Sequence, residues 1–120
     1  MFEKVNYQEN EKVLCLKITE GLTDKENDAL GQLLERQATK FGKIRLLLIF
    51  KGYPRADRAE SLYDDLRFAK LFAEKIERMA VVGDKAWQET WIALFGLFGG
   101  ITTAYFEHSD MDKAKAWLAG

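Results

Sequence analysis

The hydrophobic and polar positions of this chain change their spacing several times, and each spacing predicts one kind of element. Short alternating or continuous apolar runs predict five strands, at residues 2–8, 12–19, 44–50, 78–84 and 101–107. The polar turn at 9–11 joins the first two. The run IRLLLIF is almost entirely apolar, which is typical of a central strand buried on both faces.

Apolar residues at helical spacing predict four helices between and after these strands, at about 24–40, 57–75, 85–98 and 109–118. The second of these has one continuous apolar line, formed by Leu62, Leu66, Ala69, Ala73 and Ile76. Its other sides carry further apolar side chains, so more than one face of this helix needs to be covered.

Capping residues support the ends of these helices. Thr23 and Glu26 have the spacing of a capping box before the first helix, and Gly42 is expected to end that helix. Asp84 is suitably placed to cap the third helix, and Ser109 or Asp110 to cap the last.

Strands that alternate with helices predict an α/β fold for the whole of residues 1–120, as one domain. We expect a mixed, largely parallel sheet of four to five strands with about four helices. The chain has no low-complexity tract and a single proline, Pro54, so the sequence marks no linker.

The composition of the chain limits the classes of function that we expect. The 120 residues carry a net charge of −1, with charges of both signs interspersed, so nucleic acid is not an expected partner. The one cysteine, Cys15, excludes an internal disulfide and favours a reduced, cytoplasmic setting, where we expect it to be packed in the core. No apolar stretch reaches the roughly 20 residues of a spanning helix, although transient contact with a membrane surface stays open.

The chain lacks the constellations that would indicate an enzyme. The sole histidine, His108, follows the last strand, and no serine or cysteine nucleophile accompanies it at a recognisable turn. Asp64 and Asp65 are neighbours, so on a helix they point about 100° apart, a poor geometry for a metal or a shared proton. We therefore expect no catalytic residue, no metal site and no cofactor.

The least charged segment is WIALFGLFGG, at residues 91–100. On a helix its aromatic residues form one stripe that suits packing on a sheet, but Ile92 and Leu97 fall outside that stripe. A helix end that is apolar nearly all round must be covered by something. Three readings stay open: a filled core, a homodimer interface, or one wall of a pocket.

The pocket reading predicts a site for a small non-polar ligand between the second and third helices. The apolar residues expected to line it are Leu62, Phe68, Phe72, Trp91, Phe95 and Phe98. Arg55 and Arg58 follow the central strand, at the carboxyl end where ligands tend to bind in such sheets, and are expected to meet any polar head group.

A set of ordered motifs resembles a known family. The segments DDLRFAK, IERMAVVGDKAW, ITTAYFE and KAKAWL, in this order and spacing, resemble the SpoIIAA-like family, which belongs with the STAS domains. The resemblance covers essentially the whole chain and implies a mixed sheet with helices packed on it. The layering also looks like that of the CRAL-TRIO lipid carriers, which implies a capacity to hold non-polar molecules.

The same resemblance implies a second function. STAS domains of the anti-sigma-factor antagonist type bind a partner kinase and are switched by phosphorylation of a serine in an Asp-Ser-Ser/Thr-Gly turn. Here the corresponding stretch reads KGYPRADRAES, without that turn, and Ser61 is the one serine at the helix start. The alternative to a ligand carrier is thus a regulatory module that binds a protein partner without the usual phosphoserine motif.

Overall fold

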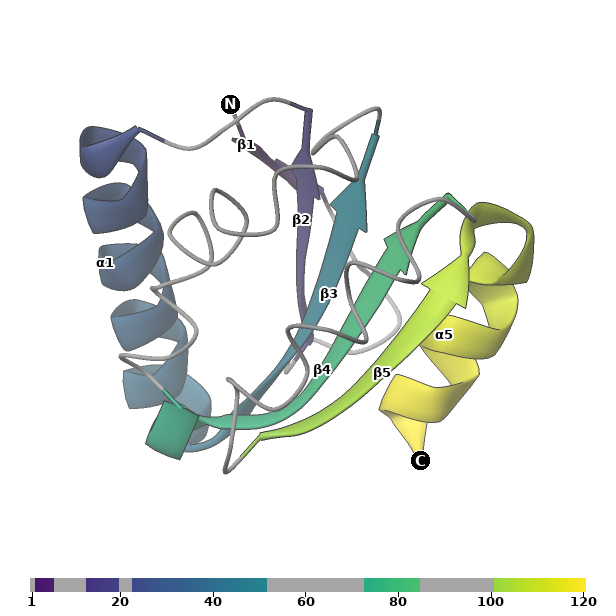
Figure 1. The fold of residues 1–120 in the computed structure, drawn as a ribbon. Helices are drawn as coiled ribbons and strands as arrows, with labels where there is room; N and C mark the ends of the chain where they lie inside the picture. The colour runs from purple at the N-terminus through teal and green to yellow at the C-terminus, as the bar shows by residue number, and fades with distance from the viewer. Residues whose placement is uncertain (1, 6–12, 20–22, 52–72, 85–100) are drawn as a thin grey trace.

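A five-stranded sheet forms the centre of the molecule (Figure 1). The computed structural model describes residues 2–5, 13–19, 23–51, 73–84 and 101–120. The strands, in their order across the sheet, are β1 (Phe2–Val5), β2 (Val13–Ile18), β3 (Ile44–Phe50), β4 (Ile76–Gly83) and β5 (Thr102–Glu107). Strand β1 is antiparallel to β2, and every later pair is parallel.

Two α-helices and two short 3₁₀ turns complete the described elements. Helix α1 (Asp24–Phe41) connects β2 to β3, and helix α5 (Met111–Ala119) follows β5. The 3₁₀ turns are η1 (Ala73–Lys75), directly before β4, and η3 (His108–Asp110), directly before α5. The α/β class and the mixed, largely parallel sheet predicted from the sequence are confirmed.

Helix α1 begins and ends at the residues that the sequence predicts. The Glu26 amide donates to the Thr23 hydroxyl at 3.1 Å, and the Glu26 carboxylate accepts from the Thr23 amide at 3.3 Å, which completes the capping box. At the other end Gly42 has a φ of 81°, and its amide donates to the Ala38 carbonyl at 2.7 Å. Glycine suits this position because other residues rarely adopt such a φ.

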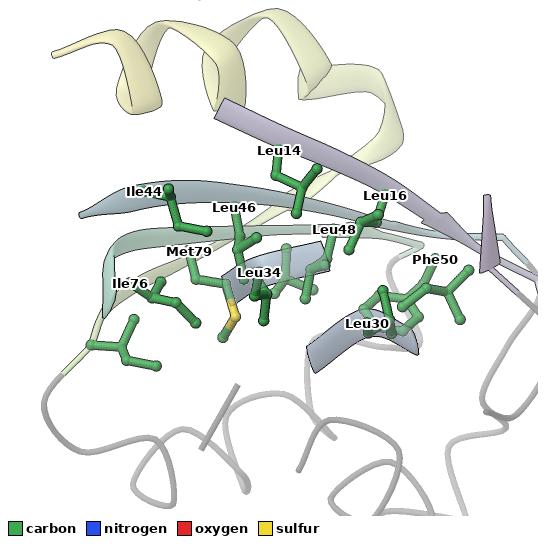
Figure 2. Packing of buried hydrophobic residues seen from close by; sticks show 13 residues of the cluster. Leu14, Leu16, Leu30, Leu34, Ile44, Leu46, Leu48, Phe50, Ile76 and Met79 are labelled. Carbon is green, nitrogen blue, oxygen red and sulfur yellow. The ribbon is translucent and has the colours of Figure 1, made fainter. Parts of the chain in front are cut away.

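The larger half of the core lies between the sheet and α1 (Figure 2). Leu30 and Leu34 of α1 are fully buried against alternate side chains of the strands. The strand residues on this face, which we call the α1 face, are Leu14, Leu16, Ile18, Ile44, Leu46, Leu48, Phe50, Ile76, Met79, Val81 and Tyr105.

Helix α5 packs on the opposite face of the sheet, over β3, β4 and β5. Ala114 and Leu118 are its buried residues. They pack with the strand residues of this face, the α5 face, namely Val5, Val13, Cys15, Leu47, Ile49, Ala80, Val82 and Phe106. Both faces of β3 are therefore covered, as its continuous apolar run predicts.

One predicted element boundary is wrong, and one predicted helix cap is confirmed in its position only. Ile76 begins β4 and faces α1, so it does not belong to the apolar line of a preceding helix. Asp110 stands at the N-cap position of α5, but its side chain makes no capping hydrogen bond. Its carboxylate lies 3.6 Å from the Lys113 ammonium instead, an exposed pair of the kind that contributes little to stability.

Candidate functional site

The residues predicted to hold a ligand or a phosphate all lie outside the described residues. This applies to Leu62, Phe68, Phe72, Trp91, Phe95, Phe98, Arg55, Arg58 and Ser61. The helix predicted at 85–98 and most of the helix predicted at 57–75 also lie outside the described residues.

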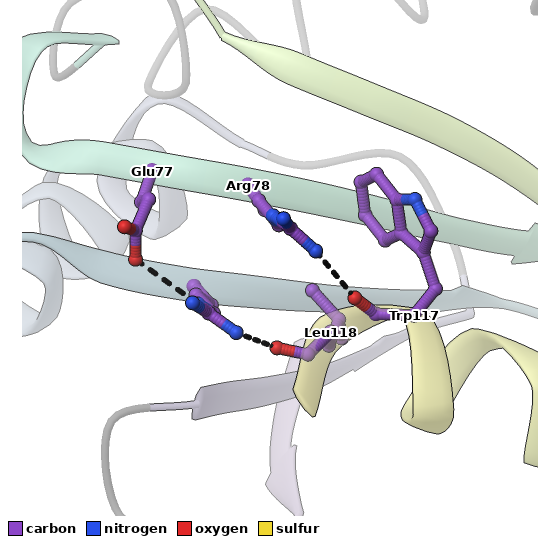
Figure 3. Close-up of polar contacts among 5 residues, drawn as sticks. Glu77, Arg78, Trp117 and Leu118 are labelled. Atoms are coloured by element: carbon purple, nitrogen blue, oxygen red, sulfur yellow. Dashed lines mark hydrogen bonds and ion pairs between the residues drawn. The ribbon is translucent and has the colours of Figure 1, made fainter. Parts of the chain in front are cut away.

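Within the described residues, a group of polar side chains lies where the last turn of α5 meets the sheet (Figure 3). Arg78, on β4, donates from Nη1 to the Trp117 carbonyl at 2.7 Å. The guanidinium of Arg78 also lies over the Trp117 ring, 5.3 Å from its centroid, in a cation–π contact. Phe106 of β5 packs against the same indole, with ring centroids 6.1 Å apart. Trp117 is thus held by one hydrogen bond and two ring contacts.

Arg45, on β3, makes a second connection to the end of α5. Its Nη1 donates to the Leu118 carbonyl, and its Nε donates to Glu77 Oε2 at 3.0 Å. The Arg45 side chain is only 15% exposed, whereas that of Glu77 is 38% exposed. A guanidinium so far removed from water needs partners for its donors, and the carboxylate and the carbonyl supply them.

An irregularity in the sheet brings these side chains together. Ile44 pairs with Ile76, but the next residue, Arg45, pairs with Arg78, so Glu77 is an extra residue on β4. Ile76 and Met79 both face α1, which leaves Glu77 and Arg78 as two consecutive residues directed to the α5 face. A β-bulge allows two neighbouring side chains to share one face in this way.

This arrangement, which we call the α5 clamp, is suited to anchoring rather than to chemistry. The last carbonyls of a helix lack partners within the helix and carry partial negative charge. Two arginines satisfy two of these carbonyls, and Glu77 offsets part of the added positive charge. The clamp was not predicted from the sequence, although the polar pair Glu77-Arg78 between apolar Ile76 and Met79 breaks strand alternation and is a recognisable signal of a bulge.

A second polar contact lies near the carboxyl ends of β4 and β5. The Tyr105 hydroxyl donates to the Asp84 carbonyl. Burial, and then the negative charges of Asp84 and Glu107, raise the pKa of Tyr105 well above its usual range. The phenol therefore stays protonated and acts as a hydrogen-bond donor, which ties the end of β4 to β5.

Cys15 is packed in the core, as the sequence predicts, and His108 lies in an exposed turn. Cys15 is buried on the α5 face, where burial raises the pKa of its thiol and the charge of Lys115 offsets part of that rise. A thiol with a raised pKa is a poor nucleophile. His108 is exposed, in η3. The described residues contain no group of three or more side chains that could hold a metal ion.

The solvent side of α1 carries a shallow hollow of about 490 Å³ among the described residues. It is lined by four exposed residues of α1, namely Gln32, Glu35, Arg36 and Thr39. Lys75 reaches Glu35 at 3.9 Å, which links η1 to this helix. The described lining residues are all polar or charged and the hollow is open, whereas sites that hold small ligands are mostly apolar and enclosed.

Comparison with known proteins identifies the family. Curated proteins and solved structures yield no match to this chain. Within the described residues no helix has the length and apolar character that a membrane crossing requires. The family model described as SpoIIAA-like matches residues 13–119, which include four strands of the sheet and both described α-helices. This match and the mixed α/β sheet agree with the resemblance seen in the sequence, and the chain belongs to the SpoIIAA-like family.

Proposed function

We propose that this protein is a non-enzymatic binding module that holds a small non-polar ligand on the α1 side of its sheet. Membership of the SpoIIAA-like family supports a binding or regulatory role. The choice of a non-polar ligand rests on one observation, the order and direction of the strands.

Strands β2, β3, β4 and β5 lie side by side in sequence order and all run parallel. Connections between parallel strands of one sheet are right-handed in nearly all proteins. Each step moves in the same direction across the sheet, so each connection is expected on the same face. Because α1 covers the face that carries Leu46 and Leu48, the rule assigns the connections after β3 and after β4 to that face too.

The α1 face of the sheet is apolar well beyond the strand that α1 contacts. Helix α1 packs chiefly on β3, at one side of the molecule (Figure 1). On β4 and β5 the same face continues with Met79, Val81 and Tyr105, and Ile101 joins the same cluster. These side chains offer an apolar floor for any ligand held between the sheet and its connections.

The ligand-binding residues belong to those two connections. The walls we propose are Leu62, Phe68 and Phe72 on one segment and Trp91, Phe95 and Phe98 on the other. Burial of apolar surface, at about 25 cal/mol per Å², would supply most of the affinity. Arg55 or Arg58 would pair with a carboxylate or phosphate head group, since a guanidinium matches either.

Native mass spectrometry of protein purified without detergent tests this proposal. We expect a co-purifying mass that organic extraction removes and that Trp91→Ala or Phe95→Ala weakens. Trp117→Ala is the matched control, because it also removes an indole but from the α5 face. Circular dichroism establishes that each variant is folded.

The outcomes separate a pocket from a general loss of stability. Loss of the bound mass in Trp91→Ala alone supports the proposal. Equal loss of the bound mass in Trp91→Ala and Trp117→Ala would mean that ligand binding depends on the overall stability of the protein and not on the proposed wall residues. Protein that carries no extractable mass and binds no non-polar probe contradicts the proposal.

Family membership favours a second candidate, a STAS-type regulatory module that binds a protein partner. The stretch KGYPRADRAES lacks the phosphorylated turn of the anti-sigma-factor antagonists, so binding would not depend on the usual switch. Stoichiometric phosphorylation at Ser61 by a cognate kinase, abolished in Ser61→Ala, would favour this candidate over the carrier.

A further inference from the structure

The described residues contain one buried polar side chain, that of Asn27 on α1. Asn27 is only 6% exposed, and its Oδ1 atom has no hydrogen-bond partner within this part of the chain. A buried acceptor without a donor lowers the stability of a folded protein, and such groups are rare. The oxygen therefore points to a donor that the described residues do not supply.

Asn27 lies on the sheet-facing side of α1, at the carboxyl edge of the sheet. It precedes Leu30 and Leu34 by three and seven positions, which places all three on one face of the helix. Helix α1 connects two parallel strands, so it runs against them and begins where they end (Figure 1). Ile18 and Phe50, the last residues of β2 and β3, carry the apolar α1 face up to this edge. Asn27 is thus a polar group at the end of an apolar surface, where ligands tend to bind in parallel sheets.

The orientation of the Asn27 amide is set by α1 itself. Its Nδ2 donates to the Thr23 carbonyl, one turn earlier, at 3.3 Å. If the amide turned over, Oδ1 would face that carbonyl, and two acceptors would oppose each other. The nitrogen therefore stays with the helix, and the oxygen is left to accept a hydrogen bond from elsewhere.

We propose that Asn27 Oδ1 accepts a hydrogen bond from a hydroxyl on the head group of the bound non-polar molecule, so that the site selects hydroxylated amphiphiles. This inference rests on the proposed function and names the class of ligand. A carboxylate offers only acceptors to this oxygen, whereas a hydroxyl can donate to it. A hydroxyl next to an acidic group would bind Asn27 and leave the acidic group to Arg55 or Arg58.

Burial of the oxygen agrees with a ligand held in the interior. Sites for small molecules enclose most of their ligand, so the groups that recognise it lie away from bulk water. Atoms of the chain cover Oδ1, and a head group reaches it only when side chains on the α1 side move apart. Without a ligand the acceptor is unsatisfied, so this residue should lower the stability of the protein alone.

Binding of two matched probes, measured by isothermal titration calorimetry with the full chain, tests the inference. The probes are dodecanoate and 2-hydroxydodecanoate, which share their chain length and charge and differ by one hydroxyl. We expect the hydroxylated probe to bind roughly tenfold more tightly, as one additional hydrogen bond allows. Asn27→Leu should bind both probes equally. Gln32→Leu is the matched control, since it removes an exposed amide of the same helix and should keep the preference.

Urea unfolding of the same variants separates recognition from a structural role. Asn27→Leu should unfold at an equal or higher urea concentration than the unaltered protein, because the unsatisfied acceptor is gone. If Asn27→Leu does not fold, Asn27→Ala provides the same comparison of probes with a smaller side chain.

The outcomes distinguish this inference from the proposed function. Equal affinity of the unaltered protein for both probes overturns the inference and leaves a carrier of non-polar molecules in place. A preference that folded Asn27→Leu or Asn27→Ala retains overturns it as well. So does a marked fall in the urea midpoint of Asn27→Leu, which would mean that the oxygen is satisfied within the chain. Binding of neither probe contradicts the proposed function itself, and the inference with it.

Discussion

Thr23 stabilises the start of α1 through the capping box described above. Replacing it with alanine leaves the Glu26 amide without its side-chain acceptor and removes the hydroxyl that donates to the Glu26 carboxylate, although the backbone amide of residue 23 still donates to that carboxylate. We expect Thr23→Ala to lower the free energy of unfolding by about 1 kcal/mol, measured by urea denaturation. Thr39→Ala is the control, because its exposed hydroxyl only donates to the Glu35 carbonyl, and it should change stability by less than about 0.5 kcal/mol.

Two residues predict how stability responds to alkaline pH. The pKa of Cys15 is raised by burial, partly offset by Lys115, and that of Tyr105 is raised by burial and by Asp84 and Glu107. The folded state therefore holds both protons more tightly than the unfolded chain does. Their stabilising effect is complete below the unfolded pKa values, about 8.5 for the thiol and about 10 for the phenol, and is lost as pH rises above them.

Urea unfolding between neutral and strongly alkaline pH measures this loss. Cys15→Ala should remove the part of the decline that begins near pH 8.5, and Tyr105→Phe the part that begins near pH 10. If the unfolding free energy of both variants falls with pH as steeply as that of the unaltered protein, other groups cause the alkaline sensitivity.

At the scale of elements, the α5 clamp decides how firmly the last helix is attached. Arg78→Ala removes the hydrogen bond to the Trp117 carbonyl and the contact with its ring. We expect Arg78→Ala to lower the free energy of unfolding by about 1–3 kcal/mol. Hydrogen exchange should also be faster in the amides of α5, residues 111–119, than in those of α1. Arg78→Lys keeps the charge but not the planar fork, so it should recover only part of the loss.

The elements also show what the sequence could and could not predict. Apolar runs and the capping box are sufficient to predict β2, β3 and α1, because local spacing and local hydrogen bonds define these elements. The start of β4 was assigned to a helix because Ile76 also fits a helical line from Leu62. Whether such a residue continues a helix or opens a strand depends on its pairing with Ile44, which no local pattern contains.

The α5 clamp illustrates the same limit for a polar site. Arg45 is separated by more than 30 positions from Glu77 and by more than 70 from Leu118. Only the parallel register of β3 and β4, with its bulge, brings these positions together. The two polar residues after Ile76 indicate the bulge, but not which helix end it will meet. The predicted ligand-binding residues, from Arg55 to Phe98, stay a prediction.

For the whole molecule, the division of the core between two faces predicts one cooperative unit. Leu46 and Leu47 are neighbours on β3, both fully buried, and point to opposite faces. Leu46→Ala and Leu47→Ala should each lower the unfolding free energy by about 2–5 kcal/mol. Both variants should unfold in a single transition with an unchanged dependence on urea, since either face depends on the same strand.

Two separate transitions would contradict that expectation. In Leu47→Ala, for example, the loss of α5 signal before that of α1 would mean that the helix leaves the sheet on its own. Hydrogen exchange of the two helices, followed through the urea transition, distinguishes these cases.

The extra residue on β4 also affects how the length of this chain can change. Removing one residue from a strand normally turns every later side chain to the wrong face. Here the loss of Glu77 would place Arg78 directly after Ile76, opposite Arg45, and Met79 would still face α1. Relatives one residue shorter at this point should therefore keep the fold and lose only the carboxylate beside Arg45, whereas a deletion at Ala80 should prevent folding. Comparing the expression and thermal unfolding of these two deletion variants would show whether this strand has one position at which its length is free to vary.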